Sequence, residues 1–218
     1  MHVSFLSTIW DYVKIKSPTR KFREWEGSWI MLRIIAGECK GRILKTVPGR
    51  STRPTTDRVK ESVFNILQPR LYGASILDLF SGTGNLGLEA MSRGSRNAVF
   101  VERAPAALAV LRENCQALHY TDAVEILAQD VQRAISLLSA RRGVFDIVFM
   151  DPPYDSDLEA VTIAALDVSH LVADGGKIVV EHLLQDEQED NIGGFIRYDM
   201  RKYGNTAVSF YGKETAQK

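Results

Sequence analysis

The residues of this chain best suited to chemistry are Asp151-Pro152-Pro153-Tyr154, which directly follow the apolar run of residues 145–150. Asp151 and the carbonyl of Pro152 can accept the two N–H bonds of an exocyclic amine, while Tyr154 can stack on the ring that carries the amine. This sequence therefore predicts a pocket for a nucleobase. The alternative is a rigid turn in which Asp151 caps the backbone and Tyr154 packs against the core.

A second motif lies upstream, where an apolar stretch of residues 75–79 runs into a glycine-rich turn and then into a helix-like segment. The spacing Gly82-x-Gly84-x-x-Gly87 fits the dinucleotide fingerprint. Alone, this spacing is a weak signal, because small glycine-rich turns are common. It places a ligand-binding turn between a strand and a helix without identifying the ligand.

Two acidic residues beside the glycine-rich turn narrow the choice of ligand. Asp78 lies inside the strand end, where a carboxylate suits a cationic or amine group and would repel a pyrophosphate. Glu102 ends the next apolar stretch, residues 98–101, where a carboxylate can take both ribose hydroxyls of a nucleoside. A nucleoside cofactor that carries an amino acid in place of a pyrophosphate fits both acids. S-adenosylmethionine is such a cofactor.

With these motifs in place, the chain from Met31 onward resembles the family of bacterial 16S ribosomal RNA (guanine-N2) methyltransferases, of the small-subunit methyltransferase D type. The resemblance covers nearly all of residues 31–212. It is carried by the glycine-rich turn, Glu102, Asp130, the Asp-Pro-Pro-Tyr sequence, Arg53-Pro54-Thr55, Arg58 and Lys60-Glu61. It implies methyl transfer from S-adenosylmethionine to the exocyclic N2 amine of a guanine in 16S ribosomal RNA, with the small ribosomal subunit as partner.

The motifs and the resemblance together give three sets of expected site residues. The catalytic set is Asp151, Pro152, Pro153 and Tyr154; the cofactor-binding set is Asp78, Phe80, Ser81, Gly82, Gly84, Glu102, Arg103, Asp130 and Val131; the RNA-binding set is Arg42, Lys45, Arg50, Arg53, Arg58 and Lys60. For Asp130, an ordinary helix N-cap before residues 131–138 is an alternative to an adenine contact. No metal site is expected, because the histidines and cysteines are scattered.

The order of apolar segments predicts an α/β fold. Strand-like segments near residues 75–79, 98–102, 124–127, 145–150 and 177–181 alternate with helical ones, which is typical of a parallel, doubly wound sheet. Segments 195–202 and 207–210 flank Tyr203-Gly204-Asn205 and predict a final antiparallel hairpin. The resemblance implies a Rossmann-like class I methyltransferase sheet of seven strands in the order 3-2-1-4-5-7-6. Upstream, the pattern predicts a β-hairpin within residues 32–46 and a helix near 57–67.

The net charge of zero conceals an asymmetry along the chain. Residues 14–70 carry 14 Lys and Arg against 5 Asp and Glu, whereas residues 71–218 carry 13 against 21. The basic part is suited to phosphates, although Lys and Arg can also simply solubilise a surface. We therefore divide the chain into an extension or upstream start (1–30), a basic RNA-docking appendage (31–70) and a catalytic domain (71–218).

Several function classes remain to be weighed. No stretch approaches the ~20 apolar residues of a membrane span, and Cys39 and Cys115 have no metal-ligand spacing, so we expect a cytoplasmic monomer without membrane or metal. A DNA adenine-N6 methyltransferase is the nearest rival, because it shares the Asp-Pro-Pro-Tyr type of sequence, but the basic part is short for a DNA-reading domain. A nicotinamide-dependent oxidoreductase is disfavoured by Asp78, and a non-catalytic RNA-binding assembly factor by the intact cofactor residues.

Overall fold

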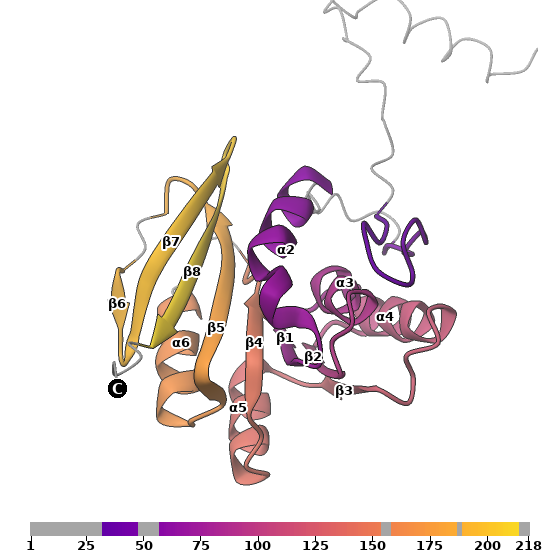
Figure 1. The fold of residues 1–218 in the computed structure, drawn as a ribbon. Coiled ribbons are helices and arrows are strands. Elements are labelled where there is room, and N and C mark those ends of the chain that lie inside the picture. The colour runs from indigo at the N-terminus through magenta and orange to yellow at the C-terminus, as the bar shows by residue number, and fades with distance from the viewer. Residues whose placement is uncertain (1–31, 48–56, 154–157, 187–188, 214–218) are drawn as a thin grey trace, which may run out of the picture.

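The computed structural model describes residues 32–47, 57–153, 158–186 and 189–213 (Figure 1). In chain order its elements are α2 (Asp57–Leu71), β1 (Ser75–Leu79), α3 (Asn85–Ser92), β2 (Asn97–Glu102), α4 (Pro105–Ala117), β3 (Val124–Ala128), α5 (Val131–Ala140), β4 (Phe145–Met150), α6 (Leu158–Val168), β5 (Val172–Leu183), β6 (Asn191–Ile192), β7 (Phe195–Tyr203) and β8 (Thr206–Lys213). The predicted extension (1–30) and most of the loop before α2 lie outside the described residues.

The strands form one sheet in the order β3-β2-β1-β4-β5-β8-β7-β6. The first five strands pair in parallel, and β5, β8, β7 and β6 pair in antiparallel. The parallel, doubly wound sheet and its final hairpin are therefore confirmed. The predicted strand count was wrong, because β6 adds an eighth strand of only 2 residues, too short to leave a periodic pattern. Without β6, the order is the predicted one.

The central strands are apolar because helices cover both faces of the sheet. All five residues of β1 are buried, as expected for a strand in the middle of a parallel sheet. On one face, Ile76, Phe100 and Ile147 pack with side chains of α2, α3 and α4. On the other face, Leu77 and Val148 pack with α5 and α6. Side chains that are to meet a ligand must therefore lie at the rim of the sheet, beyond the ends of its strands. Figure 1 shows the arrangement of the sheet and its helices.

The segment before β1 packs into the same core as the sheet. Val63, Phe64 and Leu67 form the apolar stripe of α2, and all three are buried in the cluster that contains Ile76. The helix is longer than predicted and ends at Leu71. Upstream, the predicted hairpin is present as an antiparallel bridge between residues 33 and 43. Its Leu32, Ile34 and Leu44 belong to the same buried cluster.

The hairpin of β7 and β8 reaches the edge of the sheet where the parallel strands end. It turns at Gly204-Asn205, and Gly204 has the positive φ of 62° that such two-residue turns require. Thr206, just after the turn, pairs with Leu183 at the carboxyl end of β5. Figure 1 shows the tip of this hairpin and the first turn of α2 at the same end of the molecule.

Candidate active site

The turn after β1 is held in place by its own serine. The Ser81 hydroxyl donates to the carbonyl oxygens of Asp78 and Val101 at 2.8 and 2.9 Å. Phe80 and Gly82 both have positive φ, 60° and 56°. A Cβ atom placed on Gly82 would meet nothing within 4 Å, so open space lies directly in front of the turn. The sequence motif thus forms a rigid turn that faces a space able to hold a ligand.

Asp78 points from the strand end toward the start of α3. Its Oδ2 accepts a hydrogen bond from the Gly87 N–H at 2.8 Å. A Cβ at Gly87 would come within 2.3 Å of the Phe100 ring and 2.9 Å of Asp78 Oδ2, so only glycine allows this close approach of helix and strand. Burial raises the pKa of Asp78 to about 7, against the effect of the Gly87 bond and with a further contribution from the charge of Glu102.

Glu102 at the end of β2 is fixed by backbone donors. Its Oε2 accepts from the Gly82 N–H at 2.9 Å, and its Oε1 accepts from the N–H groups of Arg103 and Ala104 at 2.8 and 2.7 Å. A carboxylate offers about four lone-pair positions. These three bonds therefore leave roughly one position for a ligand hydroxyl, fewer than the two ribose bonds that the sequence suggested.

Asp130 is the N-cap of α5, which was the alternative to an adenine contact. Its Oδ1 accepts from the Gln132 N–H at 2.9 Å. Its Oδ2 lies 3.9 Å from Arg103 Nη1, in a pair exposed to solvent. Val131, the first residue of the helix, is buried. The capping bond leaves the other carboxylate oxygen facing solvent, so the structure permits a ligand contact there without requiring one.

Asp151 follows β4 at the same rim, beside two further carboxylates. Continuing the register of Met150 with Val180 places Asp151 beside Glu181 of β5. The pKa of Asp151 is raised well above its ordinary value by desolvation, and then by the charges of Glu181 and Asp78. Asp151 is also exposed, so a ligand can reach its carboxyl group. Tyr154 lies outside the described residues.

Glu181 is a candidate site residue that sequence reasoning missed. It is 6% exposed, near the carboxyl end of β5. A signal for it existed, because the predicted strand of residues 177–181 ends in this acid, just as the second strand ends in Glu102. Since the carboxyl ends of parallel strands meet at one edge of a sheet, an acid at that position belongs with the other two.

Three of the predicted RNA-binding residues lie on the surface. Arg42 donates to the Ala117 carbonyl at 2.8 Å, and Lys45 forms an exposed ion pair with Glu113 at 2.7 Å. Arg58 is exposed in the first turn of α2. Arg50 and Arg53 lie outside the described residues. Arg42, Lys45 and Arg58 remain able to reach a phosphate.

Lys60 was wrongly predicted to contact RNA. Its side chain has no exposed area, and its Nζ donates to the Arg33 carbonyl and to Asn85 Oδ1, the latter at 2.9 Å. It also lies 3.3 Å from Glu89 Oε2. Burial lowers the pKa of Lys60, while the charge of Glu89 opposes this shift. A phosphate outside the protein cannot reach this ammonium.

Glu89 of α3 is the centre of this buried ionic cluster. Besides Lys60, it accepts from Arg93 Nε at 2.8 Å. Backbone N–H groups of Ile35 and Ala36 complete the set, at 2.7 and 3.0 Å from its two oxygens. Each carboxylate oxygen of Glu89 therefore accepts a hydrogen bond from a residue outside α3. The cluster joins residues 33–36, α2 and α3 into one unit.

Within the part of the chain that the structure describes, no group of three or more His, Cys, Asp or Glu side chains is placed to hold a metal ion. No helix in those residues has the length and apolarity needed to cross a membrane.

Comparison with known proteins gives consistent matches over most of the chain. The family model described as "Conserved hypothetical protein 95" matches residues 32–212. The "Putative rRNA methyltransferase YlbH" of Bacillus subtilis (strain 168) is 38% identical over 182 residues, which cover 84% of this chain and 99% of that protein. The "Ribosomal RNA small subunit methyltransferase D" of Escherichia coli (strain K12) is 33% identical over 183 residues, which cover 84% of this chain and 90% of that protein.

Solved structures agree with these sequence matches. The structure named "Putative methyltransferase yhhF from Escherichia coli" is 34% identical, and the match covers 84% of this chain and 98% of that one with a TM-score of 0.74. The class I methyltransferase type of fold is therefore shared along almost the whole described chain.

Proposed function

The chain belongs to the family described as Conserved hypothetical protein 95, and on that premise we propose that it methylates ribosomal RNA of the small subunit with S-adenosylmethionine as methyl donor. We further propose that the methyl group goes to the exocyclic N2 amine of a guanine. The observation that carries the proposal is the cluster of Asp78, Asp151 and Glu181 beside the open glycine turn. It suits a cationic cofactor and a base that donates N–H bonds.

The residues present fit S-adenosylmethionine by charge and by space. Desolvation raises the pKa of Asp151, and the charges of Glu181 and Asp78 raise it further; a positive ligand beside these carboxyl groups would favour their ionised forms. The empty space in front of Gly82 gives a ligand access to the backbone of the turn. A nicotinamide dinucleotide would instead bring its pyrophosphate toward the carboxylate of Asp78.

We assign each cofactor contact to a residue whose position supports it. Asp78 would bind the ammonium group of the methionine part, directly or through water, and Glu102 would accept one ribose hydroxyl at its remaining lone-pair position. Asp130 and the Val131 backbone would contact the adenine, while Phe80, Ser81, Gly82, Gly84 and Arg103 shape the surrounding turn. Bound there, S-adenosylmethionine supplies a methyl group on a positively charged sulfur, which an amine can displace.

Asp151 and Pro152 would activate the amine of the base. An exocyclic amine is a weak nucleophile because its lone pair is delocalised into the ring. By accepting its two N–H bonds, the Asp151 carboxylate and the Pro152 carbonyl would direct that lone pair toward the methyl group, and Tyr154 would hold the ring by stacking. As the new N–C bond forms, the amine becomes cationic, and its proton can pass to Asp151 or to water.

The basic segment would dock the RNA. We propose that residues 31–70 act as the docking appendage of a catalytic domain formed by residues 71–218, with Arg42, Lys45 and Arg58 exposed for phosphate contacts. Arg50 and Arg53 remain candidates in the loop before α2. The alternative substrate is adenine in DNA, which the same Asp-Pro-Pro-Tyr sequence could serve. The names of the curated relatives favour RNA.

Mass mapping of 16S ribosomal RNA tests the whole proposal. We expect RNA from a strain that lacks the gene to miss one N2-methylguanosine, and the wild-type gene to restore it. Asp151→Ala should not restore it, although its affinity for S-adenosylmethionine should stay nearly unchanged in calorimetry. Asp122→Ala is the matched control, because Asp122 is an exposed acid before β3. An unchanged methylation pattern in the deletion strain would contradict the RNA substrate, and full methylation by Asp151→Ala would contradict the assigned role.

A further inference from the structure

A groove with a volume of about 500 Å³ lies between the outer face of α2 and strand β7. Its walls are formed by Arg58, Glu61, Ser62, Asn65, Ile66 and Arg201. We propose that this groove, resting on the RNA substrate proposed above, binds the sugar–phosphate backbone next to the target guanosine. Arg201 would then be an RNA-binding residue of the β7–β8 hairpin, far in sequence from the basic segment.

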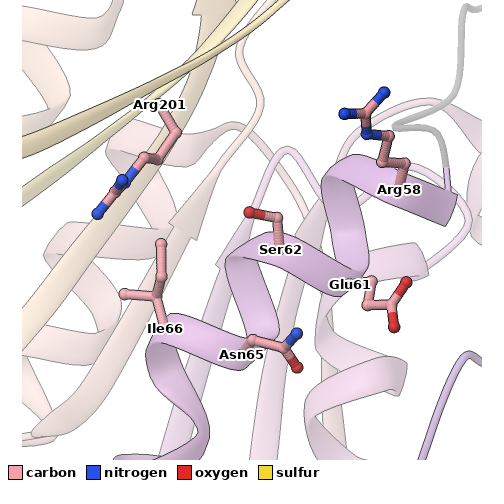
Figure 2. A pocket seen from close by; sticks show the side chains of 6 residues that line it. All are labelled: Arg58, Glu61, Ser62, Asn65, Ile66 and Arg201. Carbon is pink, nitrogen blue, oxygen red and sulfur yellow. The ribbon is translucent and has the colours of Figure 1, made fainter.

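The groove has two walls that are fixed relative to each other. Residues 58, 62, 65 and 66 share the outward face of α2 because Val63 and its neighbours turn the opposite face to the core. Figure 2 shows Arg201 reaching from the hairpin across from Ser62 and Ile66. A hydrogen bond between the Ser62 and Tyr203 hydroxyls joins helix and hairpin. The groove is therefore defined by contacts between elements and is not a gap beside a single helix.

The sheet register connects the groove to the catalytic edge. Arg201 pairs with Val208, and Val208 pairs with Glu181. Glu181 lies beside Asp151, so these four positions form one row across four neighbouring strands. Three strand spacings of about 4.8 Å put the backbone of Arg201 roughly 14 Å from that of Asp151. Opposed residues of a sheet share a face, and this face is the one covered by α2. An RNA strand that presents its base at Asp151 can continue into the groove.

The charges in the groove suit RNA backbone. Arg201 forms an exposed ion pair with Asp199 through Nη2 at 2.9 Å and Nε at 3.0 Å, which leaves other N–H donors of its guanidinium for a phosphate. Arg58 has no ion pair within the described part of the chain. Glu61 would repel phosphate but can accept a hydrogen bond from a ribose 2′-hydroxyl, the group that distinguishes RNA from DNA. The groove thus offers guanidinium groups for phosphates and a carboxylate for a ribose hydroxyl.

Salt titration of RNA binding tests the two arginines. The probe is labelled 16S ribosomal RNA from a strain that lacks the gene, and small subunits from the same strain serve as a second probe. We expect Arg58→Ala and Arg201→Ala each to weaken binding to the naked RNA and to lower the slope of log affinity against log salt by about 0.7. In methylation assays the KM for RNA should rise several-fold, while kcat and the affinity for S-adenosylmethionine should not change.

Arg141→Ala is a matched control for Arg201→Ala. Both arginines are half-exposed, 52% and 53%, and each is paired with one surface acid. Arg141 follows α5 at the opposite edge of the sheet, so its removal should leave the slope unchanged. Asn65 provides a second test, because Asn65→Asp places a new negative charge in the groove and should weaken RNA binding more than Asn65→Ala. Thermal melting of each variant checks that the fold is retained.

The outcomes separate the groove from the proposed function. If the wild type methylates the RNA while Arg58→Ala, Arg201→Ala and Asn65→Asp all bind with unchanged affinity and slope, the groove proposal is wrong and the function stands. If the wild type methylates no RNA, the proposed function is wrong. The salt titrations of RNA binding then still show whether the groove binds RNA. If the variants lose affinity only for assembled subunits, the groove contacts a ribosomal protein, and the proposal of an RNA strand is wrong.

Discussion

Two groups of charge on the same face of the sheet differ in their balance. In the first, Glu89 lies among Lys60, Arg93 and two backbone N–H groups, and neither side chain of the Lys60–Glu89 pair has exposed area. In the second, Asp78 and Asp151 lie near Glu181, and the pKa of Asp151 is raised first by desolvation and then by the charges of Glu181 and Asp78. The first group is neutralised within the chain. The second brings three carboxyl groups together at the edge of the sheet, beside the open glycine turn.

This difference distinguishes charged groups that stabilise the fold from charged groups that are available to bind a ligand. A buried ion whose partners are supplied by the fold contributes to holding elements together, and losing one partner exposes the other to the full cost of burial. A cluster of carboxylates with raised pKa values is unfavourable until a proton or a cationic ligand arrives. The balanced group should therefore respond to mutation mainly in stability, and the acidic group mainly in binding and turnover.

Removing Lys60 should have the largest effect. Lys60→Met leaves Glu89 buried without one of its cations, and we expect the free energy of unfolding to fall by about 3–5 kcal/mol. Arg58→Met, on the exposed side of the same helix, should change it by less than ~0.5 kcal/mol. Urea denaturation of both variants measures the difference. A loss below ~1 kcal/mol for Lys60→Met would mean that Arg93 and the backbone donors are enough to stabilise the buried Glu89 carboxylate. The Lys60–Glu89 ion pair would then contribute little to the stability of the fold.

The Lys60 cluster also shows where sequence reasoning failed. Lys60 stands in a basic segment, which suggested a phosphate contact, but it also lies on the inward stripe of α2 with Phe64 and Leu67. Its partner Glu89 is on another helix, and no local pattern shows that pairing. The periodicity alone could have flagged Lys60 as an inward cation in need of a buried acid.

The sheet and the glycine turn were predictable because their signals are local. Apolar runs predicted the five parallel strands, and Gly204 indicated the turn of the final hairpin. Pairings across distant segments were not predictable in this way. The groove formed by α2 and Arg201 of β7 depends on the register of the hairpin, which the sequence pattern does not specify.

Glu102 should show the next largest effect, on cofactor binding. If its one remaining acceptor position takes a ribose hydroxyl, Glu102→Ala should weaken S-adenosylmethionine binding by about 1.5–3 kcal/mol, the usual range for a hydrogen bond to a charged group. The variant also removes acceptors for three backbone N–H groups of the turn. Calorimetry should therefore be paired with a melting curve. Unchanged affinity in a folded Glu102→Ala protein would exclude it as a cofactor ligand.

Asp78 should make cofactor binding depend on pH. Its pKa of about 7 in the folded protein exceeds the ordinary value of 3.8, so it holds a proton between these values that the unfolded chain has lost. The contribution of Asp78 to the stability of the ligand-free protein should thus be fully present below pH 3.8 and be lost as pH rises toward 7. A cationic ligand prefers the ionised form, so its affinity should rise with pH over the same range, by up to about tenfold or 1.4 kcal/mol per unit.

Asp78→Asn should remove the pH dependence that Asp78 causes. Calorimetric titrations of S-adenosylmethionine between pH 5.5 and 7.5, about the range set by the raised pKa, compare the two proteins directly. We expect a sloping affinity for the wild type and a flatter, weaker one for Asp78→Asn. A wild-type affinity that does not vary over this range would show that the Asp78 carboxyl does not face the cationic part of the cofactor.

Asp130 should show the smallest effect, because it belongs to neither the Lys60–Glu89 cluster nor the acidic group of Asp78, Asp151 and Glu181. It lies at the exposed rim, where its pair with Arg103 spans 3.9 Å, and such surface pairs contribute about 0–1 kcal/mol. Its capping bond to the Gln132 N–H is the stronger interaction. Asp130→Ala should therefore cost about 1 kcal/mol of stability, whereas Asp130→Asn should cost little, since asparagine caps helices equally well. Cofactor affinity separates the two interpretations of this residue: if Asp130 binds adenine through its charge, Asp130→Asn weakens binding while the melting temperature stays unchanged, and if Asp130 is only a cap, both variants bind the cofactor like the wild type.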